Sequence, residues 1–244
     1  HVFPGQGEKS VVQGMAIYLL RVSPIARATF VQASVIFGKD MVQLCTEGTP
    51  KELAENAQLA VTVMSAAYLN AFEGGDITPA LREFQIDGKK VSLPESPPVL
   101  VAGLSTGQVS AGLAAYAYDD KTAFEIIALR QRVITECNEQ NPGTTMALLK
   151  RRGVDREGVE ELCKKFRVQI ALDNEYSQVV IGGPVESIQD AADACVEAGL
   201  AQKAVPLRTE GAFHTWMMDS AAEKFAEGLR SINIGDPYIP MIGN

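Results

Sequence analysis

Histidine and cysteine are scarce in this sequence, and their spacing argues against the commonest metal sites. The chain has two histidines, His1 and His214, too few for a His-rich metal centre. Its cysteines are Cys45, Cys137, Cys163 and Cys195. They lie far apart with no Cys-x-x-Cys pair, so neither a zinc ribbon nor a redox-active dithiol is indicated. Magnesium held by carboxylates alone stays open, but we predict buried thiols, no metal and no cofactor.

The chain also lacks a long apolar run and an excess of positive charge. No apolar stretch approaches the ~18 residues that a membrane-spanning helix requires, and no secretory signal opens the sequence. We therefore expect a cytoplasmic protein with no membrane partner. The 22 Lys and Arg stand against 30 Asp and Glu, a formal net charge of −8. Because nucleic-acid binding needs a concentrated basic surface, we expect no nucleic-acid partner.

The pattern that is present is typical of an α/β domain. From residue 1 to about 139, short apolar runs alternate with longer segments of helical periodicity. The apolar run Pro98–Ala102 predicts a buried strand in a mainly parallel sheet. Before it, Gln85–Leu93 has the pattern of a small hairpin, with Asp87 and Gly88 as its turn.

A different pattern occupies residues 143–207. Strands and helices are predicted in the order βαββαβ, at 144–149, 155–166, 168–172, 178–181, 184–198 and 201–207. This order predicts a ferredoxin-like subdomain. The α/β pattern resumes after Leu207, so the larger domain should comprise residues 1–142 and 208–244, with 143–207 inserted. A continued doubly wound sheet is the alternative, but the two middle strands are too close in sequence for a crossover helix.

A GxSxG pattern, Gly103–Gly107, directly follows the predicted buried strand and precedes a helical segment. A serine at such a strand-to-helix turn exposes its Oγ at the carboxyl end of a sheet, and the amide of the next residue points at the developing oxyanion. We predict Ser105 as a nucleophile. A purely structural Gly/Ser turn is the alternative.

A nucleophilic serine needs a base, and once the terminal His1 is set aside only His214 is available. His214 stands just ahead of a predicted amphipathic helix. The dipole of a helix N-terminus disfavours the imidazolium form, which would help to keep His214 neutral and able to accept a proton. A surface or capping histidine is the alternative.

The helix predicted over Thr122–Cys137 carries an arginine on its apolar face. That face consists of Ala123, Ile126, Ile127, Arg130, Val133, Ile134 and Cys137. Arg132 lies roughly 200° away around the helix and should be solvated. The inward-facing Arg130 requires a carboxylate or several carbonyl partners. A bound ligand and an internal Asp or Glu both remain open as that partner.

Phe3–Gly7 places a glycine-flanked turn after an N-terminal strand, ahead of Lys9 and Ser10. The GxxxxGK[ST] spacing of a phosphate loop is absent, so this turn does not predict a nucleotide site.

Taken in order, these motifs make the chain similar to the malonyl-CoA:acyl carrier protein transacylases and the related acyltransferase domains of polyketide synthases. Phe3–Gly7 matches the FPGQG of that family, and Gly103–Gly107 matches its GHSxG. Arg130 matches its substrate arginine, Asn174–Gln178 its NxPxQ, and Gly211–His214 its GAFH. The resemblance implies a hydrolase-like α/β catalytic domain with a ferredoxin-like insert, in agreement with the pattern above.

The resemblance also implies roles for individual residues. Ser105 would be the nucleophile and His214 the base, with an oxyanion hole formed by the backbone amides of Gln6 and Thr106. Arg130 would bind the free carboxylate of a malonyl group. The remaining implied substrate-site residues are Phe213, beside the α-carbon of the acyl group, Leu104, and, in supporting roles, Asn174 and Gln178. Malonyl-CoA would acylate the serine, and the phosphopantetheine thiol of an acyl carrier protein would collect the malonyl group.

The sequence departs from the family pattern at three positions. Leu104 replaces the usual His, Thr106 a frequent Leu, and Tyr176 the usual Pro. Leu104 and the missing proline are also similar to the transacylase subunit of malonate decarboxylases, which serves a different carrier. A serine thioesterase or esterase and a non-catalytic acyl-binding module are the other classes left open.

A basic cluster is the remaining candidate for partner binding. It comprises Lys150, Arg151, Arg152, Lys164, Lys165 and Arg167. Such a cluster is suited to an acidic carrier protein, and an ordinary solvated surface is the alternative.

Overall fold

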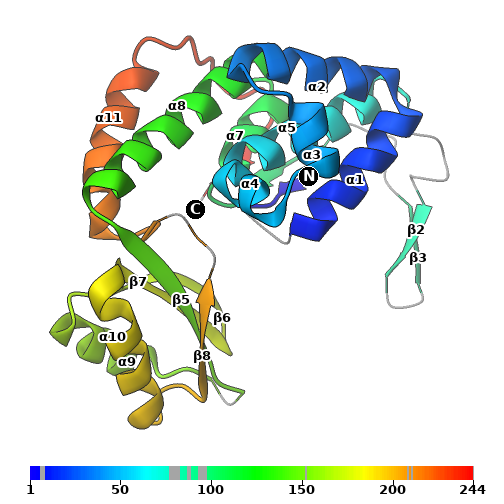
Figure 1. The fold of residues 1–244 in the computed structure, drawn as a ribbon. Helices are drawn as coiled ribbons and strands as arrows, with labels where there is room; N and C mark the ends of the chain where they lie inside the picture. Colours follow the sequence, from blue (N-terminus) through cyan, green and yellow to red (C-terminus); the bar gives the residue numbers. More distant parts are fainter. Residues whose placement is uncertain are drawn as a thin grey trace. The chain divides into compact units, whose positions relative to one another are not determined.

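The computed structural model describes residues 1–5, 9–76, 83–86, 89–92, 98–151, 153–207, 209 and 211–243 (Figure 1). Two compact units are present. The first unit comprises His1–Gln131 and Leu229–Asn244, and the second comprises Arg132–Gly228. No helix within the described ranges is both long enough and apolar enough to cross a membrane.

The first unit contains a parallel sheet. Strands β1 (Val2–Phe3), β4 (Val101–Gly103) and β9 (Met241–Ile242) pair in the order β1-β4-β9. The predicted α/β class with a parallel sheet is therefore confirmed. The expectation that its strand begins at Pro98 is wrong, because Val99 is 89% exposed and β4 starts only at Val101. Proline has no N–H for a sheet ladder, which accounts for the absence of Pro98 from the strand.

Helix α7 packs against this sheet, and the ends of the helices follow local sequence signals. The described helices of the first unit are α1 (Lys9–Val22), α2 (Pro24–Phe37), α3 (Met41–Glu47), α4 (Pro50–Glu55), α5 (Ala57–Glu73) and α7 (Gly107–Ala114). The long α8 (Asp120–Gln140) begins in the first unit, and its residues from Arg132 on belong to the second. Ser23 caps α2 by accepting the Ala26 amide. Thr49 and Glu52 form a reciprocal capping box that begins α4. Helix α5 is apolar nearly all round because it contacts α1, α2 and α7.

The predicted hairpin is also present in the first unit. Strand β2 (Glu83–Ile86) pairs antiparallel with β3 (Lys89–Ser92), and Ile86 lies opposite Lys89. This register leaves two residues for the turn. The turn residues themselves, Asp87 and Gly88, lie outside the described residues.

A polar network fixes the start of α8 against its neighbours. The Asn70 amide on α5 donates to Thr29 Oγ1 on α2 at 3.0 Å and to Asp120 Oδ2 on α8 at 2.5 Å. Asp120 Oδ1 is buried and has no hydrogen-bond partner among the described residues. Burial is the main reason that the pKa of this carboxyl is raised.

The second unit contains a four-stranded antiparallel sheet with two helices packed against it (Figure 1). Its elements are β5 (Gly143–Leu149), α9 (Arg156–Lys165), β6 (Gln169–Glu175), β7 (Gln178–Pro184), α10 (Val185–Glu197) and β8 (Lys203–Leu207). This is the predicted order of elements, and Asp155 caps α9 as its sequence suggests. The strands lie in the order β6-β7-β5-β8. The 3-10 turn η1 (Trp216–Met218) and helix α11 (Asp219–Leu229) follow.

Apolar side chains from both helices and from the sheet form the core of this unit. Cys163 on α9 and Cys195 on α10 belong to it. All four cysteines are free and buried, which confirms the prediction of buried thiols. The inserted-domain boundaries at 143 and 207 stay a prediction.

The raised pKa of Asp120 predicts the pH dependence of stability. Between the ordinary carboxyl pKa and the raised one, the folded state binds more protons than the unfolded state, so stability falls as pH rises through that window. Asp120→Asn keeps an acceptor for Asn70 and removes the buried charge. We expect the variant to be more stable than the wild type at neutral pH, with the difference vanishing as pH approaches 4, in urea titrations at several pH values.

Asp119 provides the matched control. Hydrogen bonds from Thr122 lower the pKa of the Asp119 carboxyl, so its charged form stabilises the fold and this contribution disappears as pH falls. Asp119→Asn should therefore have the opposite sign at neutral pH. A loss of stability in both variants would contradict the burial argument for Asp120.

Candidate active site

Ser105 occupies a strained turn between strand β4 and helix α7. Its φ of 51° lies in the left-handed region, which costs a non-glycine residue on the order of 1–3 kcal/mol. Two backbone bonds close the turn: the Gly107 amide donates to Leu104 O at 2.8 Å, and the Gln108 amide donates to Ser105 O at 3.0 Å. The conformation is that of a nucleophile elbow, in which a sharp turn presents a serine Oγ at the end of a sheet.

Close backbone contacts explain the two glycines that flank this turn. A Cβ on Gly103 would collide with the backbone of Gly107 and Gln108 at the start of α7. A Cβ on Gly107 would collide with the carbonyl of Phe3 on β1. The GxSxG spacing therefore permits β1, β4 and α7 to meet at van der Waals distance around Ser105.

The backbone beside Ser105 lies at the N-terminus of helix α7. Thr106 is buried and directly precedes α7, where backbone amides have no intrahelical acceptor. A role for its amide in an oxyanion hole stays a prediction. Gln6, the other predicted donor, lies outside the described residues. Leu104, the residue before the serine, is 48% exposed.

Arg130 on α8 reaches the elbow. Its Nη1 donates to Thr106 Oγ1 at 3.1 Å, and its Nη2 donates to Ser105 Oγ at 3.4 Å. A third hydrogen bond joins Nη1 to the side-chain oxygen of Gln58 on α5. The helical register predicted from the sequence is confirmed, since Ile126, Ile127 and Val133 are buried and Arg132 is exposed.

The recorded partners of Arg130 are neutral oxygen atoms. Within the described part of the chain, no Asp or Glu forms an ion pair with it. Burial lowers the pKa of the guanidinium, but arginine remains protonated in proteins. A cation that is removed from water and faces only neutral acceptors gains more from a carboxylate. Of the alternatives left open by the sequence, these contacts favour a ligand carboxylate.

Gln58 is the site residue that sequence reasoning missed. It is 2% exposed and holds Arg130 from a position 72 residues earlier in the chain. A usable signal exists in the sequence: Gln58 is a polar residue among the apolar residues that begin helix α5. A buried amide requires hydrogen-bond partners, and here it finds the guanidinium.

His214 belongs to the second unit. Hydrogen bonds of the neighbouring Thr215 stabilise its loop. Thr215 Oγ1 donates to Ala212 O at 2.6 Å and accepts the Met217 amide at 3.3 Å, which caps η1. His214 is exposed and has a left-handed φ of 61°, and Phe213 is half-buried. The predicted helix follows, but a 3-10 turn precedes it.

Asn174 and Gln178 lie at the hairpin end of strands β6 and β7. The register shifts at Asn174, and Gln178 pairs with Glu175. The other end of β6 is the one that meets the His214 loop, because Gln169 Oε1 accepts the Trp216 amide at 3.2 Å. Asn174 lies five residues further along the strand, roughly 16 Å at the usual rise. Supporting roles for Asn174 and Gln178 stay a prediction.

No group of three or more His, Cys, Asp or Glu residues suited to a metal ion occurs among the described residues. What the first unit assembles is a serine hydroxyl, a helix N-terminus and a guanidinium. This set can activate and bind an acyl group that carries a second, negatively charged end.

The parallel sheet, the elbow serine and the neighbouring helix N-terminus define an α/β protein of the class that presents a GxSxG serine.

No family model matches the chain. A malonyl CoA-acyl carrier protein transacylase of Haemophilus influenzae is 30% identical over 247 residues, covering 100% of this chain and 72% of the relative. The Bacillus subtilis protein of that name is 31% identical over 250 residues, covering 100% and 71%. The chain belongs to the malonyl CoA-acyl carrier protein transacylase family.

Solved structures agree with this assignment. One contains a type II polyketide synthase acyl-carrier protein in complex with its malonyl-transacylase. It matches with a TM-score of 0.81 at 30% identity, over 100% of this chain and 73% of that chain. The transacylase of Coxiella burnetii matches with a TM-score of 0.79 at 26% identity, over 99% of this chain and 71% of that chain. The predicted family resemblance is confirmed.

The contacts at the elbow predict that two Gly→Ala substitutions in the first unit, made separately, change the unfolding free energy in opposite directions. Gly103→Ala forces a Cβ into the Gly107 and Gln108 backbone, so we expect a loss of several kcal/mol in unfolding free energy. Gly14→Ala, on α1, meets nothing within 4 Å and should stabilise the protein by about 0.5–1 kcal/mol. Thermal unfolding of both variants is the measurement. A Gly103→Ala protein as stable as Gly14→Ala would show that the elbow tolerates a side chain.

Proposed function

We propose that this protein moves a malonyl group from malonyl-CoA to the phosphopantetheine thiol of an acyl carrier protein, through an ester on Ser105. Family membership supports the reaction class. The observation that carries the assignment to residues is Arg130, a partly buried cation with neutral partners beside the elbow serine.

The chemistry proceeds in two half-reactions. Ser105 Oγ attacks the thioester carbonyl and gives its proton to the His214 imidazole, while the Thr106 and Gln6 amides stabilise the oxyanion. The carbon–sulfur bond breaks, and the departing CoA thiolate takes up the proton. The carrier thiol then loses its proton to His214 and attacks the ester, which releases Ser105 and restores the hydroxyl proton.

Arg130 sets the substrate class in this proposal. A guanidinium binds a carboxylate through two parallel charge-assisted hydrogen bonds, which an acetyl group cannot form. Gln58 holds the guanidinium in place before substrate arrives. Leu104 and Phe213 would border the acyl group, and Asn174 and Gln178 would act in support.

An esterase or thioesterase has less support, because it leaves the inward-facing Arg130 without a purpose. For the acyl carrier protein as acceptor, support comes from the relatives' names and from the structural neighbour that is bound to its carrier. The alternative function, that of the transacylase subunit of a malonate decarboxylase, differs in the carrier protein that accepts the malonyl group.

We also propose that residues 143–207 form a ferredoxin-like subdomain inserted into a hydrolase-like domain of residues 1–142 and 208–244. The βαββαβ order and the antiparallel strand order β6-β7-β5-β8 support this assignment.

Covalent labelling tests the nucleophile. Incubation with malonyl-CoA should add one malonyl group to the intact protein, as measured by mass spectrometry, and Ser105→Ala should abolish the gain. Ser110→Ala, a buried serine of the neighbouring helix α7, is the control and should retain labelling. Malonylation of the Ser105→Ala protein would refute the assignment.

Substrate selectivity tests Arg130. Arg130→Ala should lower kcat/KM for malonyl-CoA, and the fall should correspond to a loss on the order of 2–5 kcal/mol of transition-state stabilisation. The kcat/KM for acetyl-CoA should stay equal or rise. Arg132→Ala removes the same charge two residues away, on the exposed side of α8. This control should leave kcat/KM unchanged for both substrates. If Arg130→Ala lowers kcat/KM equally for both substrates and its Tm lies well below that of the wild type, Arg130 is a structural residue.

A further inference from the structure

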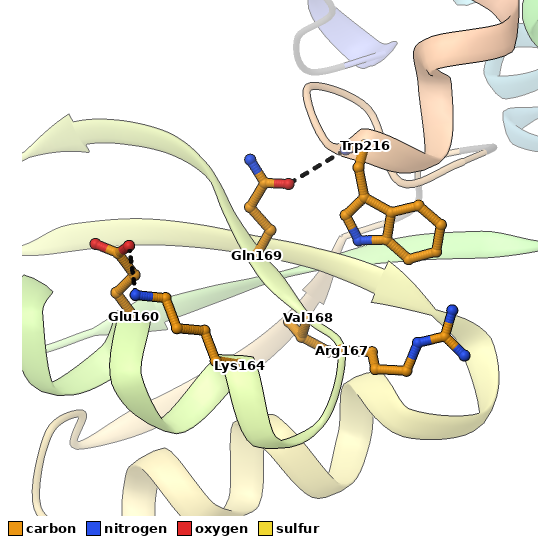
Figure 2. A pocket seen from close by; sticks show the side chains of 6 residues that line it. All are labelled: Glu160, Lys164, Arg167, Val168, Gln169 and Trp216. Atoms are coloured by element: carbon orange, nitrogen blue, oxygen red, sulfur yellow. Dashed lines mark hydrogen bonds and ion pairs between the residues drawn. The ribbon is translucent and has the colours of Figure 1, made fainter.

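The backbone of the turn η1, which directly follows Thr215, is held from two sides by side chains of the second unit. On one side, Gln169 Oε1 at the start of β6 accepts the Trp216 amide at 3.2 Å (Figure 2). On the other side, the Cys137 thiol on α8 donates to Met217 O at 3.2 Å. The two bonds therefore fix an N–H and a C=O of consecutive residues from two different elements.

Cys137 is also the acceptor in a second contact. Its sulfur lies 3.2 Å from Ser220 Oγ on α11. A thiol has a single proton, and Met217 O accepts it, so the Ser220 hydroxyl is the donor of this bond. Cys137 is 3% exposed, which shields the thiol from water. One buried sulfur atom thus joins α8 to both η1 and α11.

The Cys137 thiol bonds outside its own helix, although a local acceptor is the common choice for such groups. Several helical hydroxyls of the first unit donate to the carbonyl four residues earlier, namely Thr29, Ser34 and Thr46. Cys137 instead donates to a residue 80 positions further along the chain. The thiol therefore contributes to the position of η1 and not to the regularity of α8.

His214 is the residue that needs such support. Its φ of 61° lies in the left-handed region, which is costly for a residue with a side chain and persists only where the surrounding structure holds it. Only Thr215 separates His214 from Trp216, and Thr215 Oγ1 spans the histidine by donating to Ala212 O. The bonds of η1 to β6 and α8 join this strained segment to the rest of the second unit.

We propose that Gln169 and Cys137 are positioning residues for the base: by holding η1 on two sides, they keep His214 in the left-handed conformation from which its imidazole accepts the Ser105 proton. This inference rests on the proposed function, because that function makes His214 the base. Both side chains act through the backbone of η1. A general base must lie within hydrogen-bond reach of the proton that it takes. A loop that leaves this conformation part of the time therefore slows the chemical step without weakening substrate binding.

Single-turnover malonylation, followed by mass spectrometry at several malonyl-CoA concentrations, tests this role. Gln169→Leu removes the acceptor of one bond, and Cys137→Ala removes the donor of the other. Each variant should lower the rate at saturating malonyl-CoA by about fivefold, as expected for one lost hydrogen bond, and leave the half-saturating concentration unchanged. Gln169→Glu and Cys137→Ser keep an acceptor and a donor, so they should retain most of the wild-type rate.

Two control variants make the same changes elsewhere in the chain. Gln202 is exposed like Gln169, and its Oε1 also accepts a backbone amide, that of Arg151 at 3.0 Å. Cys45 is a fully buried thiol on α3 of the first unit. Gln202→Leu and Cys45→Ala should therefore keep the wild-type rate. Losses in these controls equal to those in Gln169→Leu and Cys137→Ala would overturn the proposal.

A double-mutant cycle with His214 separates positioning of the base from a general effect on the fold. Because the two side chains act through the imidazole, adding Gln169→Leu to His214→Ala should cost no further rate. A fivefold loss in both backgrounds would overturn the positioning role and leave the proposed function standing. A wild-type rate for His214→Ala would instead refute the base of the proposed function, and this inference with it.

Fluorescence gives a readout that does not depend on activity, because Trp216 is the sole tryptophan of the chain and is 39% exposed. Loss of either bond should loosen η1 and raise the acrylamide quenching constant of Trp216. The conservative variants and Gln202→Leu should have the quenching constant of the wild type. Unchanged quenching in both Gln169→Leu and Cys137→Ala would overturn the proposal.

Discussion

The left-handed backbone of Ser105 is the constraint on which the rest of the first unit depends. A residue with a side chain persists in that conformation only when the surrounding structure holds it there. Here Gly103 and Gly107 allow β4, α7 and the Phe3 carbonyl of β1 to meet without a Cβ between them. Parallel pairing of β1 with β4 fixes the approach. The same convergence positions the half-buried Ser105 and places the Thr106 amide at a helix N-terminus, so a single packing arrangement positions both.

Arg130 adds an electrostatic constraint to this geometry. Removing a guanidinium from water is costly, and neutral oxygens compensate only part of that cost. Two hydrogen bonds from α5 hold the guanidinium and its helix in place. Asn70 on α5 donates to Asp120 at the start of α8, and Gln58 at the start of α5 accepts from the guanidinium. Pre-organisation of this kind leaves less ordering to be done when an anion binds.

Sequence patterns predicted the features that depend on local periodicity or capping. The register of α8, the cap at Asp155 and the hairpin of β2 and β3 all follow from residues a few positions apart. Features that depend on contacts distant in the chain were missed. Gln58 meets Arg130 across 72 residues, and Cys137 meets Met217 across 80. The start of β4 was misplaced because the apolar Val99 is left exposed.

Under the proposed function, the contact between Arg130 and Ser105 would link substrate selection to the reactivity of the serine. A guanidinium donating to Oγ withdraws electron density from the atom that must attack. A malonyl carboxylate is a stronger acceptor than a hydroxyl, so on binding it would draw the guanidinium away from Ser105 and Thr106. An acetyl group offers no such acceptor and leaves Arg130 on the nucleophile. Under the proposed function, discrimination against acetyl therefore has two sources: the missing ion pair, and a serine that stays engaged with Arg130.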